Sequence, residues 1–188
     1  GGHQLVSNPG ELLSLNTIAD CMAHPLISAY FAKVARTEIA PQVEDVPGMT
    51  ATTYVDLIDR RFSNPEIVDT VRRVAFDGSS RHTGFIHPTL RDALKADAPM
   101  EGLALSEALW ARMCEGTRED GSAIEPNDPM WDQLNDAAVL ARSRPSLWLE
   151  RSGVYGDLCE DQRFVESFST WSDLLWSEGT VAALSRYL

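Results

Sequence analysis

Arginines gather in one stretch of this acidic chain, and arginine is well suited to holding a polar ligand. The protein has 188 residues and a formal net charge of −12 at pH 7. Five of its fourteen arginines nevertheless fall between Arg60 and Pro88, a segment with only three acidic residues. A guanidinium is always charged and offers five donors in a rigid fork, so such a cluster suits carboxylates, phosphates or polyhydroxylated ligands. This segment is the first candidate for a binding site.

Arg73 and Arg81 are the two arginines of this segment whose placement suggests a ligand. We expect a helix over residues 65–76, and at about 100° per residue Arg73 points about 200° away from the middle of its apolar face. Arg73 is then either an ordinary solvated surface arginine, which is the commoner case, or a functional side chain that points into a cleft. The polar turn over residues 77–81 would bring Arg81 near Arg73, where two cations suit a hydroxyl-rich ligand.

Other patterns of chemistry are not visible in this sequence. The glycines form neither G-x-G-x-x-G nor a G-K-[ST] loop, so we see no dinucleotide or ATP site. The histidines lack the spacing that places two metal ligands on one helix face, and no metal is expected. His82 and His87 are interpreted as loop histidines. The acidity argues against nucleic-acid partners, which need a basic footprint.

The cysteines and the hydropathy pattern bear on the compartment. Cys21, Cys114 and Cys159 are odd in number, far apart and without a C-x-x-C pair, so we expect reduced, mostly buried thiols, with a catalytic cysteine as the less favoured alternative. The sequence has no run of about 18 apolar residues and no signal-peptide pattern, so no membrane partner is expected. These features favour a cytoplasmic protein.

Apolar residues at helical spacing dominate the chain, and strand-like alternation is confined to residues 4–7 and 84–87. The pattern predicts an all-α, multi-helical single domain over residues 1–188. Asn64-Pro65 and Asp128-Pro129 predict helix starts, and Asn16 is expected to cap another helix. Glu44-Asp45 and Glu160-Asp161 are interpreted as solvated charges or helix caps. Helices are predicted over residues 10–15, 16–23, 25–40, 51–62, 65–76, 88–96, 103–116, 129–142, 161–176 and 179–187.

The arginine segment and the start of the chain together resemble a known family. The stretches RRFSNPEIVDTVRRVAFDGSSR and FIHPTLRD resemble the C-terminal domain of the mannitol dehydrogenase family. The opening Gly-Gly-His-Gln is similar to the family's residues at the end of a catalytic Lys-x4-Asn-x2-His motif. The stretch DCMAHPLI and the Glu-Asp-Gly loop at residues 119–121 also fit. The resemblance covers essentially the whole chain and is most specific in residues 1–92.

This resemblance implies a fold and an activity. It implies a helical domain like the C-terminal domain of 6-phosphogluconate dehydrogenases, preceded in the longer enzyme by a Rossmann domain that holds most of the NAD or NADP. The implied reaction is metal-independent hydride transfer with a sugar alcohol or sugar acid, of the mannitol-to-fructose or mannonate-to-fructuronate type. Residues 1–188 alone are expected to be inactive. The alternative is a non-catalytic helical interaction module.

The resemblance also implies roles for three residues. His3 matches the motif histidine that positions the reacting hydroxyl, although composition alone would make it a frayed terminal histidine. Arg73 matches a substrate-contacting arginine, and Arg81 falls where the family often has lysine or arginine. Gly84 departs from a frequent family lysine. The family's catalytic lysine and asparagine would precede Gly1, so the site is expected to be shared with residues outside this chain.

Overall fold

Helices make up every regular element that the computed structural model describes, over residues 2–43 and 47–188, which confirms the all-α prediction. Within these residues there are two isolated bridges and no strand. Glu44 and Asp45 lie outside the described residues. The α-helices are α1 (Gly2–Leu12), α2 (Ile18–Ala23), α3 (Pro25–Val34), α4 (Ala51–Phe62), α5 (Val71–Ala75), α6 (Gly78–Arg81), α7 (His87–Lys95), α8 (Glu101–Cys114), α9 (Trp131–Ala141), α10 (Ser146–Arg151), α11 (Gln162–Glu178) and α12 (Thr180–Tyr187). Two short π-helices, η1 (Ala35–Ile39) and η3 (His82–Ile86), and two 3-10 turns, η2 (Ala40–Gln42) and η4 (Gly156–Glu160), complete the order.

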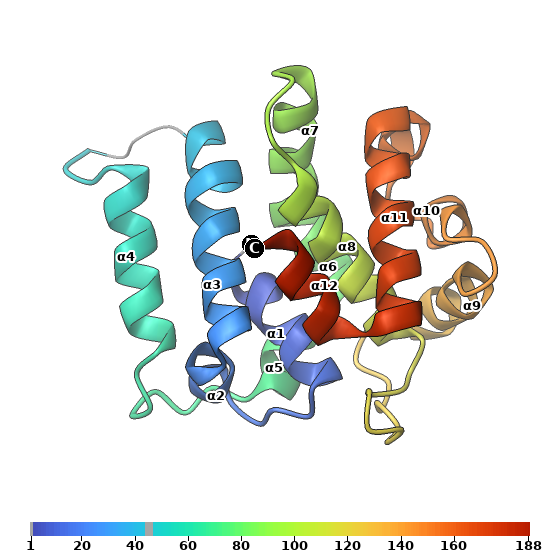
Figure 1. Ribbon diagram of the computed structural model, residues 1–188, viewed down its shortest axis with the longest axis horizontal. Helices are drawn as coiled ribbons and strands as arrows, with labels where there is room; N and C mark the ends of the chain where they lie inside the picture. The colour runs from blue at the N-terminus through green and yellow to red at the C-terminus, as the bar shows by residue number, and fades with distance from the viewer. Residues whose placement is uncertain (1, 44–46) are drawn as a thin grey trace.

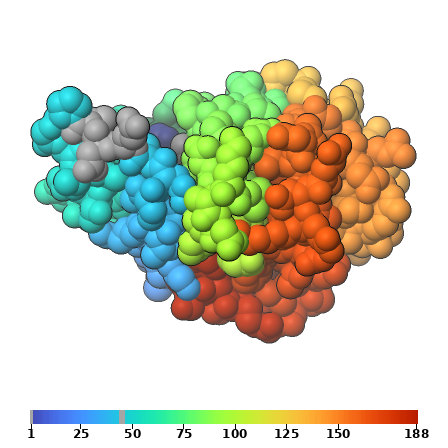
Figure 2. Space-filling view, turned by 90° about the horizontal axis from the view of Figure 1, so that it is seen from above, coloured from blue at the N-terminus to red at the C-terminus, as the bar shows by residue number. Residues whose placement is uncertain are grey.

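The helix α8 is the centre of the packing. Every residue of α8 except Glu101 and Arg112 is buried, and a helix that is apolar all round must be covered on all sides. Its neighbours are α1, α3, α9, α11 and α12, and Figure 1 shows it in the middle of the molecule. Helix α4 lies at one end, where Figure 2 shows it projecting from the main body. Only Val55 and Phe62 of α4 are buried.

A buried carboxylate on η1 caps the start of α8. Glu38 is 3 % exposed and accepts hydrogen bonds from the backbone N–H groups of Gly102 and Leu103, at 2.8 and 2.9 Å. Tyr187 donates its hydroxyl to the same carboxylate at 2.7 Å. The first N–H groups of a helix have no partner within the helix, and Met100 provides no side-chain cap. Glu38 therefore accepts hydrogen bonds from backbone N–H groups that would otherwise have no partner at the beginning of the central helix.

A second buried carboxylate joins α8 to the segment that carries the arginines. Glu107 is fully buried, and its two oxygens contact His82 Nδ1 at 2.7 Å and His87 Nε2 at 3.3 Å. Tyr155 donates to Glu107 at 2.5 Å, and Asn8 of α1 contacts the other ring nitrogen of His82 at 3.0 Å. Burial raises the pKa of Glu107, but the charges and hydrogen bonds of the two histidines outweigh it and hold that pKa below its usual value.

The prediction of loop histidines was wrong for a geometric reason. Residues 78–95 form an almost continuous helical run, in which the π-helix η3 lies between α6 and α7. A π-helix bonds residue i to i+5, so His82 and His87 fall on the same face and reach the same carboxylate. The run begins where Asp128 accepts from the N–H and Oγ of Ser79, at 2.7 and 2.8 Å.

The predicted helix over residues 65–76 was too long. Only Val71–Ala75 is helical, and Ile67 and Val68 are 41 % and 80 % exposed rather than in the core. The cause is a bridge between Thr17 and Thr70, with hydrogen bonds of 2.9 Å from Ile18 N to Asp69 O and from Val71 N to Asn16 O. These bonds hold the chain extended through Thr70, whose hydroxyl then caps α5.

Three other local predictions also need correction. Helix α1 begins at Gly2, runs through Pro9 and includes the stretch 4–7 that alternates like a strand. Thr17, not Asn16, caps α2 in a capping box with Asp20. Helix α10 was not predicted. The cysteines are all free, with Cys21 and Cys114 buried and Cys159 partly buried.

Candidate functional site

His3 lies in the first turn of α1, at the point where α4 ends. Its ring is 4.5 Å from that of Phe62, the last residue of α4, measured between centroids. Phe62 in turn packs on Phe31 of α3, at 5.6 Å. The next residue of α1, Gln4, joins α1 to α5, because its side-chain amide donates a hydrogen bond to the carbonyl of Val74 at 3.1 Å. His3 is therefore a partly buried histidine on a helix that is hydrogen-bonded to α5.

The surroundings of His3 favour its neutral form. Burial is the largest influence and lowers the pKa of His3 below the usual 6.5, and smaller effects of nearby positive charges, which include Arg81 and Arg61, lower it further. The negative charge of Asp69 opposes them and raises the pKa. A neutral imidazole has one N–H donor and one bare nitrogen. His3 can thus donate one hydrogen bond to a ligand oxygen without adding a charge.

The side chain of Arg73 extends from α5 into solvent, and Asp69 binds its guanidinium group. The side chain of Arg73 is 70 % exposed and that of Asp69 is 16 % exposed. Both Nε and Nη2 of Arg73 donate to one oxygen of Asp69, Oδ1, at 2.8 and 2.5 Å. The predicted outward direction of Arg73 is borne out by this exposure. Its Nη1 contacts no acceptor among the described residues and remains available to a ligand.

Arg81 is the second cation and ends α6. Its Nε donates to the carbonyl of Phe76 at 2.8 Å, just beyond α5. This bond folds the side chain of Arg81 back along the α5–α6 connection. No carboxylate within the described part of the chain pairs with Arg81, in contrast to Arg73. Arg81 therefore presents its terminal nitrogens with an uncompensated positive charge.

The structure brings these predicted residues into one neighbourhood through Asp69. The charges of Asp69 and Arg81 both act on His3, and Asp69 is the ion-pair partner of Arg73. Sequence reasoning overlooked Asp69 and Phe62. The spacing of Asp69 and Arg73 at i and i+4 was the available signal, because oppositely charged side chains at that spacing meet on a helix. Here the pair forms even though α5 begins only at Val71.

This arrangement offers donors to a ligand rich in oxygen. Two guanidinium groups can fix hydroxyl or carboxylate groups, and His3 adds a neutral donor. The described residues include no group of three or more metal-ligating side chains placed to hold a metal ion. No helix in the described part of the chain is long and apolar enough to cross a membrane.

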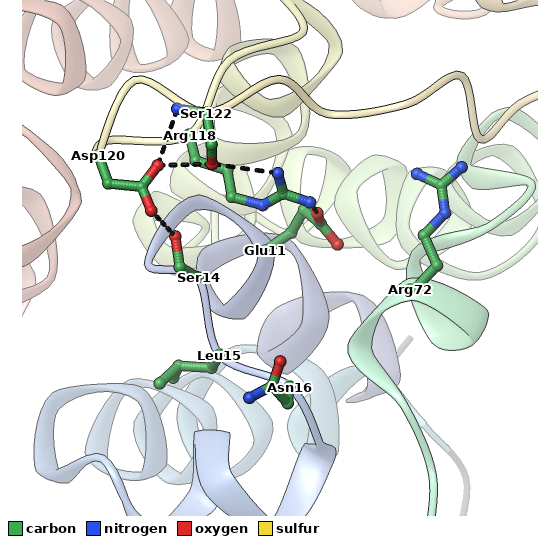
Figure 3. A pocket seen from close by; sticks show the side chains of 8 residues that line it. All are labelled: Glu11, Ser14, Leu15, Asn16, Arg72, Arg118, Asp120 and Ser122. Carbon is green, nitrogen blue, oxygen red and sulfur yellow. Dashed lines mark hydrogen bonds and ion pairs between the residues drawn. The ribbon is translucent and has the colours of Figure 1, made fainter.

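A hollow of about 280 Å³ lies beside this region, lined in part by Arg72 (Figure 3). Most of its polar side chains are already hydrogen-bonded within the protein. Arg118 contacts Glu11 at 2.5 Å, and Ser14 donates to Asp120 at 2.7 Å. Arg72 donates to the carbonyls of residues 125 and 126, at 2.6 and 2.7 Å. The side chains that line the hollow therefore bind the loop over residues 118–126 to the helices.

The fold is an all-α domain whose candidate site consists of two arginines and a partly buried histidine. Residues 1–176 match the family model of the mannitol dehydrogenase C-terminal domain. The chain belongs to this family.

Similar proteins agree with that membership. The chain is 44 % identical to a mannitol 2-dehydrogenase of Cereibacter sphaeroides and 29 % identical to one of Aspergillus clavatus, over its whole length in each case. It spans 39 % and 38 % of those relatives. A Pseudomonas fluorescens mannitol 2-dehydrogenase, solved as a ternary complex with NAD and D-mannitol, superposes with a TM-score of 0.91 at 26 % identity, over all of this chain and 38 % of that one. A D-sorbitol dehydrogenase at 21 % identity, with a TM-score of 0.86 over 97 % of this chain and 38 % of that one, shares the fold.

Proposed function

We propose that this domain binds the substrate in an NAD-dependent polyol dehydrogenase that oxidises a secondary hydroxyl of mannitol or a similar alditol. The observation that carries the proposal is the grouping of His3, Arg73 and Arg81 on a domain of this family. The relatives named as mannitol 2-dehydrogenases support the reaction class. The alternative of a non-catalytic helical module finds no specific support in the arrangement.

Arg73 and Arg81 would orient the substrate. Each guanidinium offers donors in a fixed plane, and together they would bind hydroxyls away from the reacting carbon. Holding a reactant in one geometry contributes to rate by positioning. Because Arg73 extends into solvent and Arg81 lies folded against Phe76, the two arginines would contact different parts of an extended substrate.

His3 would act at the reacting oxygen. In its neutral form, it would donate an N–H to the hydroxyl and keep that bond as the oxygen becomes a carbonyl. Phe62 supports the ring on one side. The resemblance implies that a lysine preceding this chain removes the hydroxyl proton, so His3 is proposed to orient and polarise rather than to serve as the base.

The hydride acceptor would be NAD, the cofactor bound in the Pseudomonas relative. The described residues contain no strand, and thus no strand–glycine loop–helix unit of the kind that cradles a dinucleotide pyrophosphate. We therefore attribute no nucleotide contact to His3, Arg73 or Arg81. When bound, NAD would accept the hydride from the substrate carbon.

A substrate panel on the longer protein that contains this domain tests the proposal. D-Mannitol, D-sorbitol, D-arabinitol and D-mannonate are each offered with NAD or NADP, and formation of the reduced cofactor is followed by absorbance. We expect oxidation of at least one alditol with NAD. Failure to oxidise every compound on the panel with either cofactor would refute the proposed function.

A further inference from the structure

Asp69 places a carboxylate beside the proposed substrate cations. It accepts both donors of Arg73 through Oδ1 alone. Its other oxygen, Oδ2, accepts no hydrogen bond from the described residues. The pair therefore leaves one guanidinium donor, Nη1 of Arg73, and one carboxylate acceptor, Oδ2 of Asp69, without a partner among the described residues.

Backbone bonds fix Asp69 in this position. Its carbonyl accepts from Ile18 N at 2.9 Å, and the adjacent Thr70 forms the bridge to Thr17. Thr70 also accepts from the N–H of Arg73 at 3.2 Å, which sets the start of α5. The carboxylate is mostly covered while its partner is mostly exposed. Asp69 is thus a fixed charge, and its influence extends to His3.

The chemistry of this pair distinguishes a hydroxyl from a carboxylate at the end of the substrate that lies against it. A hydroxyl both donates and accepts, so a polyol can satisfy Nη1 of Arg73 and Oδ2 of Asp69 together. A carboxylate only accepts, and the negative charge of Asp69 repels it. Asp69 also neutralises the charge of Arg73 that would otherwise attract a sugar acid.

We propose that Asp69 is a specificity-determining residue that selects neutral polyols over sugar acids, by neutralising Arg73 and offering Oδ2 to a substrate hydroxyl. This inference rests on the proposed function. It narrows the substrate class of the same site. It predicts that the longer protein oxidises D-mannitol with a higher kcat/KM than D-mannonate, in which a carboxylate replaces one terminal hydroxymethyl group.

The test compares Asp69→Asn with a matched control in the longer protein. Asn has nearly the same shape as Asp but no charge. The control is Asp157→Asn, because Asp157 also accepts Nε and Nη2 of one arginine, Arg91, through Oδ1, at 3.0 and 2.8 Å. The measured quantity is the ratio of kcat/KM for D-mannonate to that for D-mannitol. We expect Asp69→Asn to raise this ratio at least tenfold and Asp157→Asn to leave it within twofold.

The results that would overturn the role of Asp69 differ from the result that would refute the proposed function. A ratio that stays within twofold in folded Asp69→Asn, or that falls, overturns the role of Asp69. If Asp69→Asn does not fold, the unmodified protein serves as the test, and a preference for D-mannonate over D-mannitol overturns the inference. Asp69→Glu, which keeps the charge, is expected to retain the polyol preference, and its loss also counts against the inference. Activity on neither compound nor any other alditol is a failure of the proposed function itself.

Discussion

At the scale of single residues, the site depends on how its neighbours set the charge of each side chain. Burial lowers the pKa of His3 against the opposing charge of Asp69, Arg73 forms an ion pair with Asp69, and Arg81 forms no ion pair within the described residues. The three proposed contacts are therefore electrostatically different from one another. A ligand would meet a neutral donor, a compensated cation and a free cation within one region.

The protonation of His3 provides a prediction at this scale. Because burial lowers its pKa, His3 should titrate below 6.5 in the folded domain and near 6.5 in urea. The unfolded chain then binds the proton more readily, so the contribution of His3 to stability is complete above pH 6.5 and is lost as the pH falls from 6.5 through the lower folded pKa. NMR titration of the imidazole, assigned with His3→Asn, measures this directly. A folded midpoint above 6.5 would contradict the burial argument.

At the scale of elements, two buried carboxylates tie the central helix α8 to its neighbours, and one of them, Glu107, joins α8 to the segment that carries Arg81. Glu38 caps the beginning of α8, and Glu107 joins the middle of α8 to His82 and His87. His82 directly follows Arg81, and it also contacts Asn8 on the helix of His3. These contacts therefore fix the positions of Arg81 and His3 relative to the same core helix, α8.

Replacing the cap tests the first of these connections. Glu38→Gln exchanges one acceptor oxygen for an amide that must face an N–H group or the hydroxyl of Tyr187. Leaving a buried donor unsatisfied costs about 1–3 kcal/mol, so the free energy of unfolding in urea should fall by that amount. Glu178→Gln, at an exposed ion pair, is the control and should stay within about 0.5 kcal/mol of the parent. Equal stability of Glu38→Gln and the parent would argue against capping.

The second connection predicts a dependence on acid. The pKa of Glu107 is held below its usual 4.5, so its stabilising contribution is present above pH 4.5 and is lost as the pH falls further. Glu107→Gln should destabilise the domain at pH 7 by about 3–5 kcal/mol, because it breaks a buried charged network. It should also flatten the decline of stability below pH 4.5. Urea unfolding at several pH values measures both, and an unchanged acid dependence would show that Glu107 is not the responsible group.

Sequence patterns predicted the helices that bury one face correctly, and they failed where long-range contacts determine the local backbone conformation. The stripe Phe164, Phe168, Trp171 and Leu175 predicted α11, and all four side chains are buried. Residues 65–70 carry a helix signal that is overridden by the bridge from Thr17 to Thr70. Helix α1 was largely missed because residues 4–12 are buried all round, which removes amphipathic spacing.

The same distinction holds for the site. Arg73 and Arg81 were singled out by their position in the arginine segment, and the family resemblance suggested the roles of both arginines and of His3. Asp69 escaped attention although its spacing to Arg73 is visible in the sequence. The side-chain geometry shows that Asp69 pairs with Arg73. The bridge between Thr17 and Thr70 fixes the position of Asp69.

At the scale of the whole molecule, the chain covers 38 to 39 % of its mannitol 2-dehydrogenase relatives named above. Large apolar side chains are exposed within the same stretch that carries the arginines: Ile67, Val68, Phe76 and Phe85. Exposed apolar groups next to a polar site are typical of a surface that another structural unit covers. We therefore expect the site to be completed by residues outside this chain, as the family resemblance implies.

The central claim is that this domain supplies substrate contacts through Arg73, and its most direct test is the kcat/KM for D-mannitol in the longer protein. Arg73→Ala removes the proposed contact, and Arg144→Ala removes an exposed arginine that pairs with Glu150 and serves as the control. We predict that Arg73→Ala lowers kcat/KM at least tenfold, which corresponds to about 1.4 kcal/mol of transition-state stabilisation, while Arg144→Ala changes it less than twofold. An unchanged kcat/KM in folded Arg73→Ala would contradict the account.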